Sequence, residues 1–209
     1  MISNPCQVRG TPASGKTSLA ELIRYHVSQQ EPATHVIWIQ GWPFKSDRLG
    51  VAGWEDYFET VKGWDKAQET VFIFDEAQLT YNDGGFWHNF IKPIDTHDRR
   101  RAIVFASYGS PTSHVIITGT PIFIEEAQRV TLRPIQHGGN STPVGLFFTR
   151  PEFDDLVTTL YPSPQHRLDS SFLNAVFELT QGHVGAFFDF IKIIVNHEVS
   201  TFVLIRMSI

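Results

Sequence analysis

The stretch from Gly10 to Thr17, GTPASGKT, constrains the fold of this chain more than any other part of its sequence. It matches the pattern G-x-x-x-x-G-K-[ST], which binds phosphate where a strand enters it and a helix leaves it. The run from Pro5 to Arg9 predicts that strand, and Lys16 to Gln29 predicts the helix because its apolar residues recur at helical spacing. The sequence therefore predicts a phosphate-binding loop between the first strand and the first helix.

Each residue type in this loop suits phosphate binding for a physical reason. The glycines let the backbone curl so that successive N–H groups point toward phosphate oxygens, and the following helix adds free N–H groups and the positive end of its dipole. We expect Lys16 to reach the β- and γ-phosphates and the Thr17 hydroxyl to bind Mg²⁺. The alternative, a plain glycine- and serine-rich turn, does not explain the lysine and threonine after the second glycine. The expected nucleotide-binding residues of the loop are Gly10, Thr11, Pro12, Ala13, Ser14, Gly15, Lys16, Thr17 and Ser18.

An apolar strand from Val71 to Asp75, followed by Glu76, is the second predicted part of the site. An acid that ends such a strand is expected at the carboxyl edge of the sheet, where α/β proteins bind ligands. We expect Asp75 to hold Mg²⁺ through water and Glu76 to polarise the water that attacks the γ-phosphate. The alternative is a pair of acids that open a helix and favour its dipole.

Ser107, at the end of the strand predicted over Ala102 to Ser107, is the last catalytic candidate. A polar side chain there would sense the γ-phosphate or orient the water; alternatively, the serine only ends the strand before a turn. The expected catalytic residues are Lys16, Asp75, Glu76 and Ser107, and the expected metal ligands are Thr17 and Asp75.

Strand-like and helix-like segments alternate along the first part of the chain, which predicts an α/β fold with a parallel sheet. The expected strands are Pro5–Arg9, His35–Gln40, Val71–Asp75, Ala102–Ser107 and Arg129–Leu132. The expected helices between them are Lys16–Gln29, Trp54–Lys62 and Phe86–Lys92.

A segment rich in glycine, serine and proline, Ile135 to Val144, predicts a linker. We therefore expect an α/β domain over residues 1–134 and a small helical lid over residues 145–209. The lid helices are expected to run to Leu160 after the capping pair Thr149 and Glu152, from Ser170 to Leu179 after the cap Asp169, and from Val184 to His197. The abrupt ends of the chain suggest a fragment of a longer protein, with a truncated lid.

Charge and cysteine content exclude several classes of protein. Lysine and arginine number 17 against 22 acidic residues, a net charge of −5, so the general basic footprint of a nucleic-acid-binding protein is missing. The single cysteine rules out an internal disulfide and suits a reducing compartment. No apolar run approaches the roughly 18–20 residues of a membrane helix. We expect an intracellular protein of the cytoplasm or nucleus, without a membrane or nucleic-acid partner.

No arginine in the sequence is clearly placed to act as an arginine finger, which stabilises the charge on the phosphates. The run Arg99 to Arg101 lies at the amino end of a predicted strand, opposite the expected nucleotide edge, and is interpreted as a solvated charge run. Arg129 and Arg133 are better placed to approach the phosphates.

Three segments resemble the AAA+/STAND division of P-loop ATPases: Arg9–Thr17, Phe72–Gln78 and Leu179–Ala186. The last is similar to the G-H-P-G segment that opens a lid helix in that division, with Val184 in place of proline. Within the division, the chain resembles the ATPase module of Crinkler-type effector proteins and related fungal proteins. The resemblance implies a P-loop NTPase sheet of order 5-1-4-3-2, and ATP with Mg²⁺ bound between the sheet edge and the lid, with His183 at the nucleotide.

The leading hypothesis for function is a Mg²⁺-dependent ATP-hydrolysing switch that acts on an unidentified protein partner or a missing effector domain. ATP is favoured over GTP because the sequence contains no guanine-reading N-K-x-D segment. Two alternatives stay open: an interaction module that binds nucleotide without hydrolysis, and a small-molecule kinase.

Overall fold

The computed structural model describes residues 5–42, 53–95, 97–107, 124–136, 143–162 and 168–193. The end of the helix expected over Val184 to His197 lies outside these ranges, as do all later residues of the expected lid. None of the helices within these ranges is long and apolar enough to cross a membrane.

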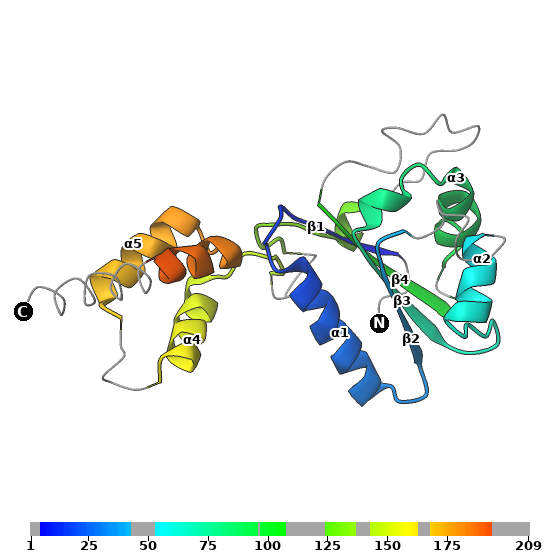
Figure 1. Cartoon of the computed structure of the whole chain (residues 1–209), viewed down its shortest axis with the longest axis horizontal. Helices are drawn as coiled ribbons and strands as arrows, with labels where there is room; N and C mark the ends of the chain where they lie inside the picture. The colour runs from blue at the N-terminus through cyan, green and yellow to red at the C-terminus, as the bar shows by residue number, and fades with distance from the viewer. Residues whose placement is uncertain are drawn as a thin grey trace, which may run out of the picture.

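A five-stranded sheet forms the centre of the structure (Figure 1), and every strand pair in it is parallel. Its strands are β1 (Cys6–Arg9), β2 (His35–Gln40), β3 (Thr70–Asp75), β4 (Arg100–Ala106) and β5 (Arg129–Val130). The spatial order is β2-β3-β4-β1-β5, which reads 5-1-4-3-2 from the β5 edge. The expected α/β class with a parallel sheet and flanking helices is confirmed. All six residues of β3 are buried, as expected for a strand covered on both faces.

One face of the sheet is covered by α1 (Lys16–Gln30). Ala20 and Val27 of this helix pack in one cluster with strand side chains that include Val71 and Ile73. Among the apolar residues at helical spacing, Val27 is buried and Leu19 and Ile23 are partly buried against this cluster, but Leu22 is 65% exposed.

The opposite face is covered by an aromatic layer from two short helices (Figure 1). The first runs from α2 (Trp54–Asp56) into the π-helix η2 (Tyr57–Val61), and the second from α3 (Gly84–Phe86) into the π-helix η4 (Trp87–Ile91). The two elements meet where the rings of Phe58 and Phe90 lie 5.4 Å apart and both contact Phe72 of β3.

The π turns correct the sequence prediction, which expected ordinary helices over these two segments. In each segment a lysine N–H bonds to the carbonyl five residues earlier: Lys62 to Tyr57 at 3.1 Å and Lys92 to Trp87 at 3.0 Å. An apolar period near 3.6 fits both kinds of turn, so the sequence pattern does not separate them. A 3₁₀ helix, η3 (Ala77–Thr80), follows β3 on the same side of the sheet.

Two strands differ in length from the prediction. β5 stops at Val130 instead of Leu132 because the carbonyls of Thr131 and Leu132 accept hydrogen bonds from Leu146 and Phe147, at 2.9 and 2.8 Å. β4 begins two residues earlier than expected, and Ser107 lies just beyond its end. A second short 3₁₀ helix, η5 (Glu126–Gln128), leads into β5.

The arginine run lies at the amino end of β4, as predicted, and Arg99 is exposed, but Arg100 and Arg101 are partly buried. Arg100 pairs with Asp98, and Arg101 reaches Glu31 at the end of α1; each arginine side chain is only 19% exposed. Arg99 donates to the carbonyl of Ala67. These charges therefore stabilise the loops at the edge of the sheet opposite the phosphate loop.

Beyond the sheet, three helices form a separate apolar cluster (Figure 1). They are α4 (Arg150–Leu160), α5 (Ser170–Thr180) and residues 184–193. Both predicted caps are confirmed: Thr149 and Glu152 form the capping box of α4, and the carboxylate of Asp169 accepts from two N–H groups at the start of α5. The ends of the predicted linker, Ile135 and Val144, pair in an isolated antiparallel bridge, and residues 137–142 between them lie outside the described ranges.

Candidate functional site

The loop of residues 10–15 continues directly from β1. Gly10 extends the sheet pairing, since its N–H donates to the carbonyl of Ala106 at 3.2 Å. Ala13 and Gly15 adopt left-handed backbone conformations, with φ of 59° and 87°. Glycine bears this conformation without strain. Gly15 is also the N-cap of α1 and supplies no side-chain cap, so the first N–H groups of the helix are left for another partner.

Lys16 lies beneath this loop, with 6% of its surface exposed. Its ammonium donates to the carbonyls of Gly10 at 3.1 Å and Thr11 at 2.7 Å. Burial lowers the pKa of Lys16 below its ordinary value, and the negative charges of Glu76 and Asp75 oppose that lowering. The loop thus holds the positive charge of Lys16, and the negative charges of Asp75 and Glu76 lie at the end of β3.

The two sequence motifs meet through a side-chain hydrogen bond. Thr17 Oγ1 donates to Asp75 Oδ2 at 2.8 Å across 58 residues of sequence. The other oxygen of Asp75 accepts from the backbone N–H of Glu76 at 3.0 Å, and Asp75 is 5% exposed. The predicted metal ligands, Thr17 and Asp75, are therefore neighbours at the carboxyl edge of the sheet.

These neighbouring oxygens suit a small divalent cation. Hydroxyl and carboxylate oxygens are the donors that Mg²⁺ prefers, and Mg²⁺ commonly completes its shell with water and substrate phosphates. In the described ranges, this site included, no three His, Cys, Asp or Glu side chains gather as a metal site. Thr17 and Asp75 thus fit a magnesium ion that is bound together with a phosphate ligand.

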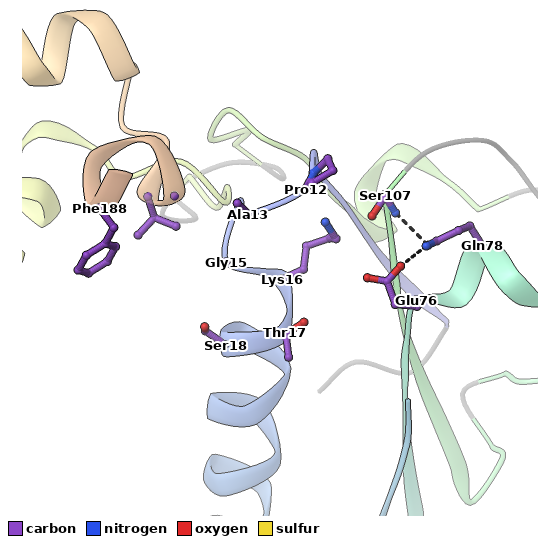
Figure 2. Close-up of a pocket in the computed structure, with 12 residues that line it drawn as sticks. Pro12, Ala13, Gly15, Lys16, Thr17, Ser18, Glu76, Gln78, Ser107 and Phe188 are labelled. Atoms are coloured by element: carbon purple, nitrogen blue, oxygen red, sulfur yellow. Dashed lines mark hydrogen bonds between the residues drawn. The ribbon is translucent and has the colours of Figure 1, made fainter. Parts of the chain in front are cut away.

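Glu76 follows Asp75 in a left-handed conformation, with φ of 55° and ψ of 38°. Its exposed carboxylate accepts a hydrogen bond from the amide nitrogen of Gln78 (Figure 2). The amide oxygen of Gln78 in turn accepts from the backbone N–H of Ser107 at 3.1 Å. Glu76 and Ser107, two of the predicted catalytic residues, are therefore connected through Gln78, which was not predicted as a site residue.

The start of the helix at residues 184–193 rests on the phosphate loop. The N–H of Gly185 donates to the carbonyl of Ala13 at 3.1 Å, and His183 Nε2 lies 3.2 Å from Thr11 Oγ1. Because the N–H of Ala186 donates to His183 Nδ1, a neutral His183 carries its proton on Nε2 and donates to Thr11. His183 therefore braces the loop.

A pocket of about 620 Å³ lies above the loop (Figure 2). Its lining residues are Pro12, Ala13, Gly15, Lys16, Thr17, Ser18, Glu76, Gln78, Ser107, Val184, Gly185 and Phe188. Glu76 and Phe188 lie on opposite sides of the loop, so the pocket has an acidic end and an apolar end. The predicted site residues that do not line the pocket are Gly10, Thr11, Ser14, Asp75 and His183, and Arg129 and Arg133 are also outside its lining. Asp75 is connected to the pocket by its hydrogen bond with Thr17.

Four lining residues were missed by sequence reasoning: Gln78, Val184, Gly185 and Phe188. A signal existed for three of them. Gln78 stands two residues after Glu76, and Val184 and Gly185 belong to the segment whose likeness to a lid motif was noted. Phe188 reaches the pocket because it lies one helical turn after Val184. Phe187 and Phe190 stand beside it in the sequence, so nothing in the sequence singles out Phe188.

Comparison of the chain with protein-family models and with curated proteins found no match. A cradle of backbone N–H groups, a buried lysine and a paired hydroxyl and carboxylate together suit a polyphosphate with a divalent cation.

Proposed function

We propose that this chain binds ATP with Mg²⁺ in the pocket above the Gly10–Thr17 loop and hydrolyses it. The observation that carries the proposal is the 2.8 Å hydrogen bond between Thr17 and Asp75. It brings the expected phosphate loop and the expected acidic pair into one site, although 58 residues separate them. The parallel sheet with a loop between β1 and α1 supports the P-loop NTPase fold as part of this proposal.

The residues in and next to the pocket would have different roles. The loop and the start of α1 would bind the phosphates through backbone N–H groups, and Lys16 would exchange its carbonyl partners for phosphate oxygens. Thr17 and Asp75 would hold Mg²⁺, which when bound neutralises charge that develops on the phosphates. Glu76 would accept a proton from the attacking water, because its carboxylate lines the same pocket.

The apolar end of the pocket suits the nucleoside. If the γ-phosphate lies toward Glu76 and Ser107, then the base lies toward Phe188. Aromatic side chains such as Phe188 offer a face on which a base stacks. We keep ATP as the proposed nucleotide because the chain lacks the guanine-reading segment.

A switch of the AAA+/STAND type, related to Crinkler-type ATPase modules, is the form of ATPase that we propose. The contact of the helix at residues 184–193 with the phosphate loop supports it. A nucleotide between these two parts would change how they pack, and a partner protein or a further domain would read that change.

The test is Mg²⁺-dependent turnover of ATP and GTP by the purified chain, beside Lys16→Ala and Glu76→Gln. We expect Glu76→Gln to abolish turnover while nucleotide binding survives, and Lys16→Ala to weaken binding about tenfold or more. Lys66→Ala and Glu55→Gln are matched controls, since these residues form an exposed ion pair outside the pocket lining.

Other outcomes would point to other functions. Binding without turnover by the parent chain would indicate an interaction module that does not hydrolyse nucleotide. Transfer of phosphate to a metabolite would indicate a kinase.

A further inference from the structure

Gln78 occupies a position between the two strand ends that face the pocket. Its amide nitrogen donates to the carboxylate of Glu76, and its amide oxygen accepts from the backbone N–H of Ser107 at 3.1 Å (Figure 2). β3 ends one residue before Glu76, and β4 ends one residue before Ser107. Gln78 thus connects the ends of two adjacent parallel strands at the pocket.

The orientation of the Gln78 amide follows from its partners. The N–H of Ser107 is a donor only, so it must face the amide oxygen, and the amide nitrogen must then face Glu76. An ionised carboxylate is an acceptor only, which agrees with this orientation. The same side chain therefore satisfies a fixed donor on one side and a fixed acceptor on the other.

Without this contact, no side-chain hydrogen bond within the described residues would restrain the carboxylate of Glu76. Glu76 is exposed, and within the described ranges Gln78 gives the only side-chain hydrogen bond to its carboxylate. Its backbone takes a left-handed conformation that residues other than glycine seldom adopt. A flexible carboxylate on such a backbone samples several rotamers, and most of them do not point at one fixed place in the pocket.

We propose that Gln78 is a positioning residue that holds the carboxylate of Glu76 near the end of β4. There the carboxylate would accept a proton from the water that attacks the γ-phosphate. This inference rests on the proposed hydrolysis. Glutamine is suited to the task by length and by charge. Asparagine is one methylene shorter and would not span the two partners. Glutamate would still accept from Ser107, but its charge would repel Glu76.

The kinetic test compares Gln78→Ala, Gln78→Asn and Gln78→Glu with the parent chain. We expect kcat to fall by roughly 10- to 100-fold in the first two, because small misplacement of a reacting group costs up to about 10²-fold. KM and the affinity for ATP should stay within about threefold, since the side-chain hydrogen bonds of Gln78 within the described residues go to Glu76 and Ser107 and not to the loop of residues 10–15. In Gln78→Glu kcat should also fall, because the added carboxylate repels Glu76 from its position.

Gln68→Ala serves as the matched control, since Gln68 donates to the carbonyl of Ala33 far from the pocket lining. Melting curves with and without nucleotide separate a loss of positioning from a loss of folding. A parent-level kcat in Gln78→Ala, or a KM that rises as kcat falls, would overturn the inference while leaving the proposed hydrolysis intact.

A second measurement does not depend on turnover. The side-chain amide resonance of ¹⁵N-labelled Gln78 should shift in Glu76→Gln, because this variant removes the carboxylate that accepts the hydrogen bond. A resonance that is insensitive to Glu76→Gln would overturn the contact itself. A parent chain that binds ATP but never hydrolyses it would remove the proposed function and, with it, the role of Gln78 in attack.

Discussion

Gly10 lies where the phosphate loop, the side chain of Ser14 and the segment leading to α4 converge. A Cβ atom at this position would come within 2.4 Å of Ser14 Oγ and 2.5 Å of Leu146 Cδ1. The first glycine of the loop is therefore required by packing at this position. Its backbone φ is not in the left-handed region, in contrast to that of Gly15.

We expect Gly10→Ala to lower the free energy of unfolding by about 1–3 kcal/mol, because both neighbours must move away from the added methyl group. Urea unfolding followed by circular dichroism would measure this loss. Gly53→Ala is the control, since a Cβ at Gly53 meets nothing within 4 Å. Equal stability of the two variants would contradict the packing argument.

At the scale of the elements, ion pairs hold the amino end of β4 on the side away from the pocket. The carboxylate of Asp98 accepts hydrogen bonds from the backbone and the guanidinium of Arg100. Burial raises the pKa of Asp98, but the hydrogen bonds and charge of Arg100 outweigh burial and lower it below its ordinary value. Arg100 and Arg101 therefore stabilise the end of the sheet, and the expectation of a solvated charge run was wrong for these two residues because it missed their acidic partners.

The lowered pKa predicts how stability responds to acid. The contribution of Asp98 is present above its unfolded-state pKa of about 3.8 and is lost as pH falls through its lower folded-state pKa. We expect Asp98→Asn to cost on the order of 1 kcal/mol at pH 7 and to remove this acid dependence. Urea unfolding at pH 7 and below pH 4 would check both expectations.

Asp154→Asn provides the contrast for this prediction. Asp154 pairs with Arg150 four residues away on the exposed surface of α4, so its loss should cost only about 0.3–0.5 kcal/mol. A loss for Asp98→Asn no greater than that for Asp154→Asn would contradict a structural role for the Arg100 pair.

At the scale of the whole molecule, the helix at residues 184–193 joins the helical cluster to the phosphate loop. Phe187 and Ile191 pack into the helical cluster, while Gly185 rests on Ala13 of the loop. A Cβ at Gly185 would lie 2.5 Å from the carbonyl oxygen and the Cβ of Ala13. One helix therefore contacts both parts of the molecule.

We expect Gly185→Ala to move this helix away from the loop and to weaken ATP binding roughly tenfold. This change corresponds to about 1.4 kcal/mol of binding free energy. A fluorescent ATP analogue would measure the affinity. Gly85→Ala is the control, because its nearest neighbour would be Asp83 Oδ1 at an ordinary 3.5 Å. Unchanged affinity in Gly185→Ala would show that the helix does not form part of the nucleotide site.

Local patterns in the sequence determined the elements and the main chemical groups of this protein. Apolar spacing located α1, the capping residues located the starts of α4 and α5, and buried runs located β3 and β4. The residues of the loop and of the acidic pair were identified because their order along the chain reflects a local geometry. Such signals need only a few neighbouring residues, so they can be read without a fold.

Tertiary structure alone decided the rest. The ion-pair partners of the arginines, the π turns of the aromatic layer and the early end of β5 depend on residues that are distant in sequence. Gln78 gains its place between Glu76 and Ser107 only because β3 and β4 pair in parallel and end at the same edge of the sheet. Phe188 reaches the pocket only because Gly185 lets its helix rest on Ala13, and close approach between distant segments leaves no periodic mark in a sequence.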